Sequence, residues 1–357
     1  MTGRRRAAAL FAALVLAAVP EAAAGATGHA RWRLDARALP LEYLQGLTHG
    51  PGGARYFAGV FSGLYRTDRA LRERARNAAA LPPAVTALGF DHIGDLTFDR
   101  SRGGRLILPL ECYVPGAPNG GNTCGRGAFG VADPRTLAFR YLVPLDPADI
   151  AKAMWAEVGP GGRLVWTSSG RDLLAYRTRE IRPGRTAPLR PVRRLRGAVP
   201  PSGVTGATVE GRRLLLAGQL SAERLQVWSV DLRIGARRLE LEVTGIAAES
   251  EGLDLVGGRL SWMLSPFAPD GRPPTFGTGH SELLTFSRRI SRCSRPKAIR
   301  LPAAWKPSLS STRREARLPG STIAVTASRP RPSNAAPTQA PAASVPRPRP
   351  HHACASV

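Results

Sequence analysis

A short module recurs five times along this chain. Each copy has an apolar segment with a polar residue at its head, a glycine-rich turn, a second apolar segment, a loop, and a third segment that ends in a basic turn. The stretch 90–111 shows the first half of the module most plainly. An arginine precedes each second segment, and these arginines are 50, 58, 50 and 46 residues apart: Arg55, Arg105, Arg163, Arg213 and Arg259. Short segments rich in β-branched and aromatic residues, bounded by Gly, Pro or Asp turns, are typical of strands.

The period of the module predicts an all-β fold of the β-propeller type. A repeat of ~40 to 50 residues that holds four short strands is typical of a propeller blade. Five modules predict five blades, with a sixth blade and a β-sandwich as the alternatives, and fourth strands are expected at 139–145 and 237–243. The stretch 31–43 has strand character, so we expect it to close the ring as the outer strand of the fifth blade. The predicted propeller domain spans 27–290.

The N-terminus has the pattern of a secretory signal peptide, predicted over 1–26. Three arginines at 4–6 precede the apolar run 7–19, and small residues follow at 22–26. The run is too short for a membrane span, which needs about 20 residues, and no later stretch is apolar enough. We expect cleavage after Ala24 or Ala26, a secreted protein, and no transmembrane segment in the mature chain.

The cysteines agree with export. Cys112 and Cys124 bracket a loop rich in Gly, Pro and Asn in the second blade. In an oxidising compartment such a pair predicts a disulfide. A metal site is the alternative, but it lacks the C-x-x-C spacing and nearby histidines.

The charge distribution argues against nucleic-acid binding. The formal net charge of +25 divides into +2 for residues 1–24, +13 for residues 287–357, and 25 − 2 − 13 = +10 for the body. Only three lysines occur, and the arginines lie mostly in turns, without stacking aromatics on one face. The Pro-, Arg-, Ser- and Ala-rich stretch 291–357 is predicted to be a disordered tail. It is interpreted as a wall-associating segment, a linker, or the product of a reading-frame change.

Polar residues at the heads of the innermost strands are the candidate site. Gln45, Asp95, Glu157 and Glu251 could converge at the central channel, where Ca²⁺ would take six to eight oxygen ligands. Asp95, Glu157 and Glu251 are the predicted metal ligands, and a cation there would polarise an ester or lactone carbonyl. The register raises an objection to a single ring. Gln45 and Glu251 stand two residues before an apolar residue, whereas Asp95 and Glu157 stand one residue before it, and adjacent strand residues face opposite sides. Either bulges correct the register in two blades, or these residues do not form one ring.

Two further residues are candidate ligand-binding groups. His92 follows Asp91 at the start of a strand. It could act as a general base that the Asp91 carboxylate orients, or it could be a structural hydrogen-bonding residue. Glu249 shares a strand face with Glu251, which suits a paired-carboxylate site or an exposed strand edge. The sequence contains no G-x-S-x-G, P-loop, dinucleotide or H-E-x-x-H motif.

The stretch 251–254, the Gly-Gly-Arg-Leu turns and the signal peptide resemble exported bacterial propellers, over about residues 45–286. The chain is similar to the gluconolactonase and regucalcin group, the phytase-like esterases and the YVTN-type surface propellers. The lactonase resemblance implies a Glu-Gly-Pro metal-ligand motif in the first blade, where this chain has Gln45, Gly46 and Leu47.

Two functions follow as hypotheses. The first is a secreted propeller, expected to be a monomer, that binds a small molecule or a surface protein. The alternative is a metal-assisted hydrolase of an ester, lactone or phosphoester at the central channel. Since propellers host unrelated functions, the fold does not decide between them.

Overall fold

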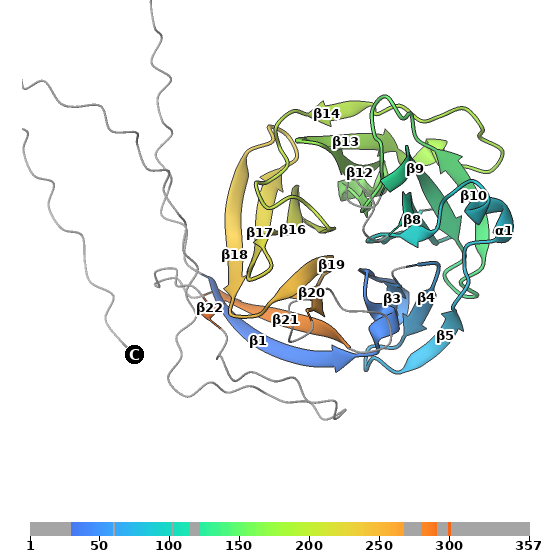
Figure 1. The fold of residues 1–357 in the computed structure, drawn as a ribbon. Helices are drawn as coiled ribbons and strands as arrows, with labels where there is room; N and C mark the ends of the chain where they lie inside the picture. The colour runs from blue at the N-terminus through green and yellow to red at the C-terminus, as the bar shows by residue number, and fades with distance from the viewer. Residues whose placement is uncertain are drawn as a thin grey trace, which may run out of the picture. The chain divides into compact units, whose positions relative to one another are not determined.

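The structure is a computed structural model, and it describes residues 30–59, 61–101, 103–114, 122–267, 280–290 and 299–300. Five antiparallel sheets surround a central axis, so the five-bladed propeller is confirmed (Figure 1). The predicted signal peptide 1–26 lies outside the described residues, as does the predicted tail apart from residues 299–300. Within the described residues, no helix is long and apolar enough to cross a membrane.

In blades 1 to 3, the strands follow one another along the chain from the axis outward. Blade 1 has β2 (Gly46–His49), β3 (Arg55–Ala58), β4 (Leu64–Thr67) and β5 (Glu73–Asn77). Blade 2 has β6 (His92–Ile93), β7 (Thr97–Asp99), β8 (Arg105–Tyr113), β9 (Asn122–Ala132) and β10 (Phe139–Pro144). Blade 3 has β11 (Glu157–Val158), β12 (Leu164–Ser169), β13 (Asp172–Arg177) and β14 (Arg193–Leu195).

Blade 4 has β15 (Gly206–Glu210), β16 (Arg213–Ser221), β17 (Arg224–Asp231) and β18 (Arg237–Thr244), with β22 (Ile299–Arg300) added in parallel to β18. The expected fourth strands of blades 2 and 4 are therefore present as β10 and β18. Among the residues that the structure describes, the helical segments are short: α1 (Pro83–Thr86) and four 3-10 turns at Leu41–Tyr43, Pro51–Gly53, Pro160–Gly162 and Thr178–Glu180.

Blade 5 joins the two ends of the ring. It consists of β19 (Ala248–Val256), β20 (Arg259–Pro266), β21 (Ser281–Ile290) and, as its outer strand, β1 (Ala30–Leu39). Ten residues of β1 pair with ten of β21 in antiparallel register, from Ala30 opposite Ile290 to Leu39 opposite Ser281. Figure 1 shows β1 running along the outside of β21. The predicted closure by the N-terminal strand is thus confirmed, and it covers the outer edge of β21.

The core consists of five apolar clusters, and each fills the space between two neighbouring blades. Trp155, Trp166 and Trp262 are among its largest fully buried side chains. Strand alternation sends apolar side chains to both faces of each sheet, because a blade packs against a neighbour on either side. The blades are therefore held in fixed positions around the axis, where the candidate site lies.

Candidate functional site

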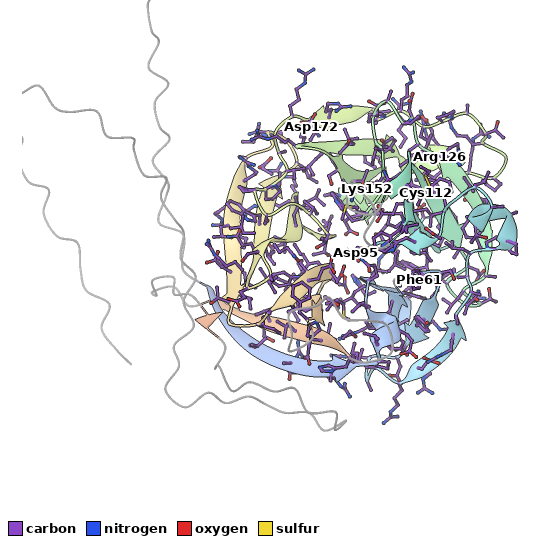
Figure 2. All side chains as sticks on the ribbon, in the orientation of Figure 1. Phe61, Asp95, Cys112, Arg126, Lys152 and Asp172 are labelled. Carbon is purple, nitrogen blue, oxygen red and sulfur yellow. A yellow bond between two sulfur atoms is a disulfide. The ribbon has the colours of Figure 1, made fainter. Side chains whose placement is uncertain are left out.

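The carboxylate of Asp95 occupies the centre of the ring, fully buried (Figure 2). Its Oδ1 accepts a hydrogen bond from the backbone N–H of Leu47 in blade 1, at 2.9 Å. Its Oδ2 accepts from the N–H groups of Ala207 in blade 4, at 2.9 Å, and Leu253 in blade 5, at 3.4 Å. Burial raises the pKa of Asp95 well above its usual range, and the three N–H donors oppose that shift. Both oxygens are thus engaged by backbone groups of other blades.

The backbone of Asp95 extends this connection to blade 3. Its N–H donates to the carbonyl of Met154 at 3.0 Å, and its own carbonyl accepts from the N–H of Ala156 at 2.9 Å. Glycines permit this close approach of the inner strands. A Cβ on Gly94 would overlap the Met154 carbonyl, and one on Gly252 would lie 2.8 Å from Asp95 Oδ1. Steric space at the axis therefore explains glycine at these two positions.

Several acidic side chains lie together on one side of Asp95, namely the side from which the innermost strands begin. We define the acidic cluster as Gln45, Glu111, Tyr113, Glu249 and Glu251. The Gln45 Nε2 donates to Glu251 Oε2 at 2.7 Å. Burial raises the pKa of Glu251 well above its usual range, and the carboxylates of Glu249, Asp95 and Glu111 raise it further. Glu251 is only 2% exposed. Glu249 is exposed to solvent over the residue as a whole, but its carboxylate is partly buried, and this burial raises its pKa.

Blade 2 contributes Glu111 and Tyr113 from the end of β8. Burial raises the pKa of Glu111 to about 7, with a smaller contribution from Asp91, while the Lys152 ammonium acts in the opposite direction. Glu111 Oε1 lies 3.6 Å from His92 Nε2. Glu111 is 3% exposed, and its Oε2 is without a hydrogen-bond partner among the residues that the structure describes.

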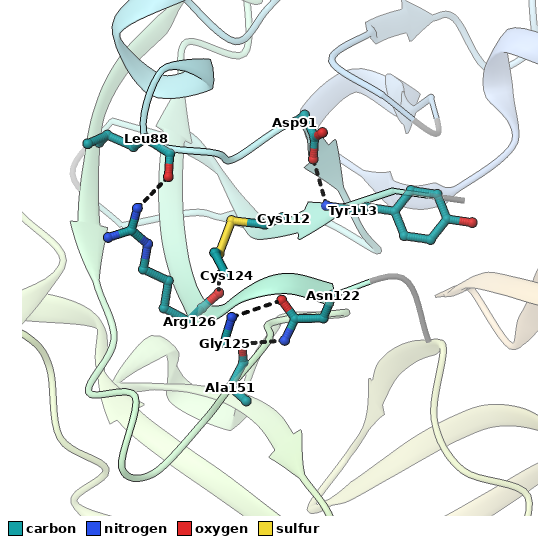
Figure 3. Close-up of a disulfide and its surroundings, with 9 residues drawn as sticks. All are labelled: Leu88, Asp91, Cys112, Tyr113, Asn122, Cys124, Gly125, Arg126 and Ala151. Atoms are coloured by element: carbon teal, nitrogen blue, oxygen red, sulfur yellow. Dashed lines mark hydrogen bonds between the residues drawn. A yellow bond between two sulfur atoms is a disulfide. The ribbon is translucent and has the colours of Figure 1, made fainter. Parts of the chain in front are cut away.

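A disulfide holds the strand that carries these two residues. Cys112 and Cys124 are bonded, with their Cα atoms 5.7 Å apart, which confirms the predicted pairing. Asp91 Oδ1 accepts a hydrogen bond from the N–H of Tyr113 at 2.7 Å. Figure 3 shows the Tyr113 ring pointing away from the disulfide. The ring lies 4.8 Å from that of His92, and burial and the carboxylates of Glu249, Glu111 and Glu251 raise the pKa of Tyr113.

Glu157 belongs to a different group of side chains, on the other side of Asp95. Its Oε2 accepts a hydrogen bond from Thr97 Oγ1 at 2.6 Å. Burial raises the pKa of Glu157 to about 8, and the Asp254 carboxylate adds to the shift. Asp254 in turn lies 2.8 Å from His49 Nδ1. Thr97, Glu157 and Asp254 come later in their segments than the residues that bond to Asp95 or than Asp95 itself. Gln45, Glu249 and Glu251 of the acidic cluster come earlier.

The predicted site residues therefore separate. Gln45, Glu249 and Glu251 come together, with His92 beside Glu111 at the edge of the same cluster, while Asp95 is enclosed at the axis and Glu157 lies beyond it. Asp95, Glu157 and Glu251 do not fit one metal centre, because backbone groups occupy both oxygens of Asp95 and the two glutamates are on opposite sides of it. In the described ranges, no group of three or more His, Cys, Asp or Glu has the arrangement of a metal site.

Sequence reasoning missed Glu111 and Tyr113. The available signal was a carboxylate directly after the apolar run 106–110 and directly before a cysteine. Glu111 lies opposite His92 in the β6–β8 pairing, so its side chain shares a face with that histidine. The pairing could not be known before the strands were assembled.

The chain is a five-bladed β-propeller, and its likeness to solved structures is confined to that fold. No family model and no curated protein matches the sequence. The Myxococcus xanthus glutaminyl cyclase is 11% identical, with a TM-score of 0.46 over 74% of this chain and 100% of that one. A luciferin-regenerating enzyme is 10% identical, with a TM-score of 0.45 over 72% and 95%. The PQQ-bound aldose sugar dehydrogenase of Streptomyces coelicolor is 13% identical, with a TM-score of 0.37 over 74% and 100%.

Proposed function

We propose that this protein is an exported ligand-binding propeller whose acidic cluster takes a small, positively charged molecule that carries an ammonium group. The main support for this proposal is that Glu111, Glu249 and Glu251 lie close together in a chain with 51 basic and only 26 acidic residues. The disulfide supports export, since such bonds persist in oxidising compartments.

Electrostatics favour a cationic ligand. Burial, and after it the repulsion of neighbouring carboxylates, raises the pKa of Glu251, and burial raises that of Glu111 to about 7, so that part of the cluster holds protons near neutral pH. An ammonium ion would favour the ionised forms and displace these protons. Tyr113 offers an aromatic ring beside the carboxylates, and the face of a tyrosine ring attracts cations. The unpartnered Glu111 Oε2 is an acceptor for an N–H donor of the ligand.

Calorimetry on the full, oxidised chain tests the proposal. Butane-1,4-diamine and tetramethylammonium are titrated at pH 7 in two buffers that differ in ionisation enthalpy. We expect binding with proton release, and a loss of about tenfold or more in affinity for Glu249→Gln/Glu251→Gln. The control, Glu180→Gln/Glu223→Gln, also removes two carboxylates but lies outside the cluster. Absence of binding by both probes, or an equal loss in the control, would contradict the proposal.

Hydrolysis of an ester or lactone is the second candidate, favoured by one observation. Glu111 has a pKa of about 7 and lies 3.6 Å from His92, and an acid–base group is most effective when its pKa is close to the working pH. The test is an ester and lactone screen with wild type and Glu111→Gln. Turnover that the substitution abolishes, without loss of diamine binding, would favour this candidate over simple binding.

A further inference from the structure

A second pocket lies at the joint between blade 5 and blade 1, apart from the acidic cluster. Its volume is about 940 Å³, and it is enclosed by β1, the first residue of β3, the turn between β4 and β5, and parts of β20 and β21. Five arginines line it, with Asp35 as the one acidic lining residue: Arg37, Arg55, Arg69, Arg72 and Arg259. The size is at the upper end of the range for small-molecule sites, roughly 300 to 1,000 Å³.

The arginines of this pocket are close enough to repel one another. Burial lowers the pKa of Arg55, and the cationic Arg259, Arg37 and Arg69 lower it further, while Asp254 partly compensates. Within the described part of the chain, no carboxylate lies at ion-pair distance from the guanidinium groups of Arg55, Arg69 or Arg259. The five arginines of the pocket therefore outnumber the nearby carboxylates, Asp35 and Asp254, and positive charge accumulates here.

The turn between β4 and β5 is built so that it presents two of these arginines. Asp68 Oδ1 accepts hydrogen bonds from the N–H groups of Ala70, at 2.8 Å, and Arg72, at 3.0 Å. Leu71 adopts a φ of 65°, a left-handed conformation that is rare and unfavourable for a branched side chain. The turn meets β1, because Arg37 Nη1 donates to the Ala70 carbonyl at 3.4 Å. Among the arginines of the pocket, Arg69 and Arg72 in this turn are exposed, whereas Arg37 and Arg55 are half-buried.

We propose that this pocket binds an anion with two or more adjacent tetrahedral oxyanion groups, namely phosphate or sulfate esters. A guanidinium group offers several N–H donors in a planar fork that matches two oxygens of one such group. Five of them around one pocket exceed what a single carboxylate needs. The ligand would contact both β1 and blade 1, and so would bridge the strand that closes the ring to its neighbouring blade.

The repeat itself supplies a control. Arg55 and Arg259 occupy the same place in their modules as Arg163 and Arg213, which lie directly before the second strand of blade 3 and at the start of the second strand of blade 4, outside the pocket. Arg55→Gln/Arg259→Gln and Arg163→Gln/Arg213→Gln therefore remove equal charge at equivalent positions. Both variants keep the basic C-terminal stretch, so attraction of anions to that stretch affects them equally.

The experiment uses the full, oxidised chain with inorganic tripolyphosphate and sucrose octasulfate, against sodium chloride at matched ionic strength. Thermal unfolding and calorimetry measure binding, since a ligand of the folded state raises the melting temperature. We expect the Arg55/Arg259 variant to lose about tenfold or more in affinity, and the Arg163/Arg213 variant to lose less than about twofold. A preference for tripolyphosphate would identify a phosphorylated ligand, and a preference for the octasulfate a sulfated one.

A second variant guards against misfolding. Arg69→Gln/Arg72→Gln changes two exposed turn residues whose side chains are free of ion pairs in the described structure, and it should also weaken binding by about tenfold. The proposal is overturned if neither anion raises the melting temperature above that in matched sodium chloride. It is also overturned if the control variant loses as much affinity as the pocket variants.

Discussion

The carboxylate of Asp95 accepts a hydrogen bond from the backbone N–H of Leu47 at 2.9 Å, between the innermost strands of blades 2 and 1. The same carboxylate accepts from blades 4 and 5, and the Asp95 backbone bonds to blade 3. One residue thus joins all five blades at the axis. This arrangement assigns to Asp95 a structural role, in place of the ligand role that its position at a strand head first suggested.

Removal of this side chain should destabilise the whole ring. Asp95→Ala would leave three N–H groups buried without acceptors, and we expect a loss of about 3 to 5 kcal/mol in the free energy of unfolding. Asp95→Asn keeps one carbonyl acceptor but places an NH₂ group against N–H donors, so an intermediate loss of about 1 to 3 kcal/mol is expected. Urea denaturation of the oxidised protein provides the measurement.

The matched control is Asp172→Ala, an aspartate near the molecular surface (Figure 2) whose carboxylate accepts from Gly197 N–H and pairs with Arg194. It should cost about 1 kcal/mol or less, because water replaces the lost contacts. An Asp95→Ala variant that unfolds at the same urea concentration as wild type would show that the central carboxylate does not tie the blades together.

The fold was predictable from spacing because every blade carries the same local pattern. The arginines that mark the modules lie at the start of β3, β8, β16 and β20 and directly before β12, and strand period and turn chemistry are local properties of the sequence. Closure by the N-terminal strand was also predictable, since only 31–43 remained to complete the fifth blade. Export, the domain limits and the tail stay predictions, because they fall on residues outside the described ranges.

The site was less predictable because it depends on distances between blades. The register difference between Glu251 and Asp95 left two alternatives, a bulge that corrects the register or strand heads that do not form one ring. What sequence could not reveal is that the partners of Asp95 are backbone N–H groups, which every residue except proline carries. The arginine pocket was equally hidden, because Arg55 and Arg259 are more than 200 residues apart and meet only at ring closure.

The repeated arginine has a structural role in blade 2. Arg105 is 4% exposed, its Nε donates to Asp99 Oδ2 at 2.9 Å, and its Nη2 donates to the Thr178 carbonyl at 2.9 Å. We expect Arg105→Ala to lose about 3 to 5 kcal/mol of stability, since it leaves the Asp99 carboxylate buried without its ion-pair partner. Arg163→Ala, at the equivalent exposed position of blade 3, should change stability by about 0.5 kcal/mol or less. Equal melting temperatures for the two variants would contradict this assignment.

The disulfide should matter for both stability and the acidic cluster. Cys112 and Cys124 are 12 residues apart, and closing a loop of that size stabilises a folded chain by roughly 3 kcal/mol in the chain-entropy model. We expect Cys112→Ala/Cys124→Ala to lose about that amount, and to bind butane-1,4-diamine more weakly because β8 carries Glu111 and Tyr113. If dithiothreitol lowered the melting temperature of this double variant as much as that of wild type, the effect would not come from the disulfide.

Glu111 should make the protein less stable as the pH rises. Its folded pKa of about 7 exceeds the ordinary value of 4.5, so between these two values the folded state binds more protons than the unfolded chain. The stabilisation is complete below pH 4.5 and is lost as the pH rises toward 7, by up to about 3 kcal/mol. The ionisable groups that face Glu111 are His92, Asp91, Lys152 and Glu251. We expect Glu111→Gln to gain stability relative to wild type between pH 5 and pH 8, as measured by urea unfolding at both values.

The control is Glu223→Gln, which changes an exposed carboxylate in blade 4. This variant should differ from wild type by the same amount at the two pH values. A difference between Glu111→Gln and wild type that is constant with pH would show that Glu111 is ionised in both states.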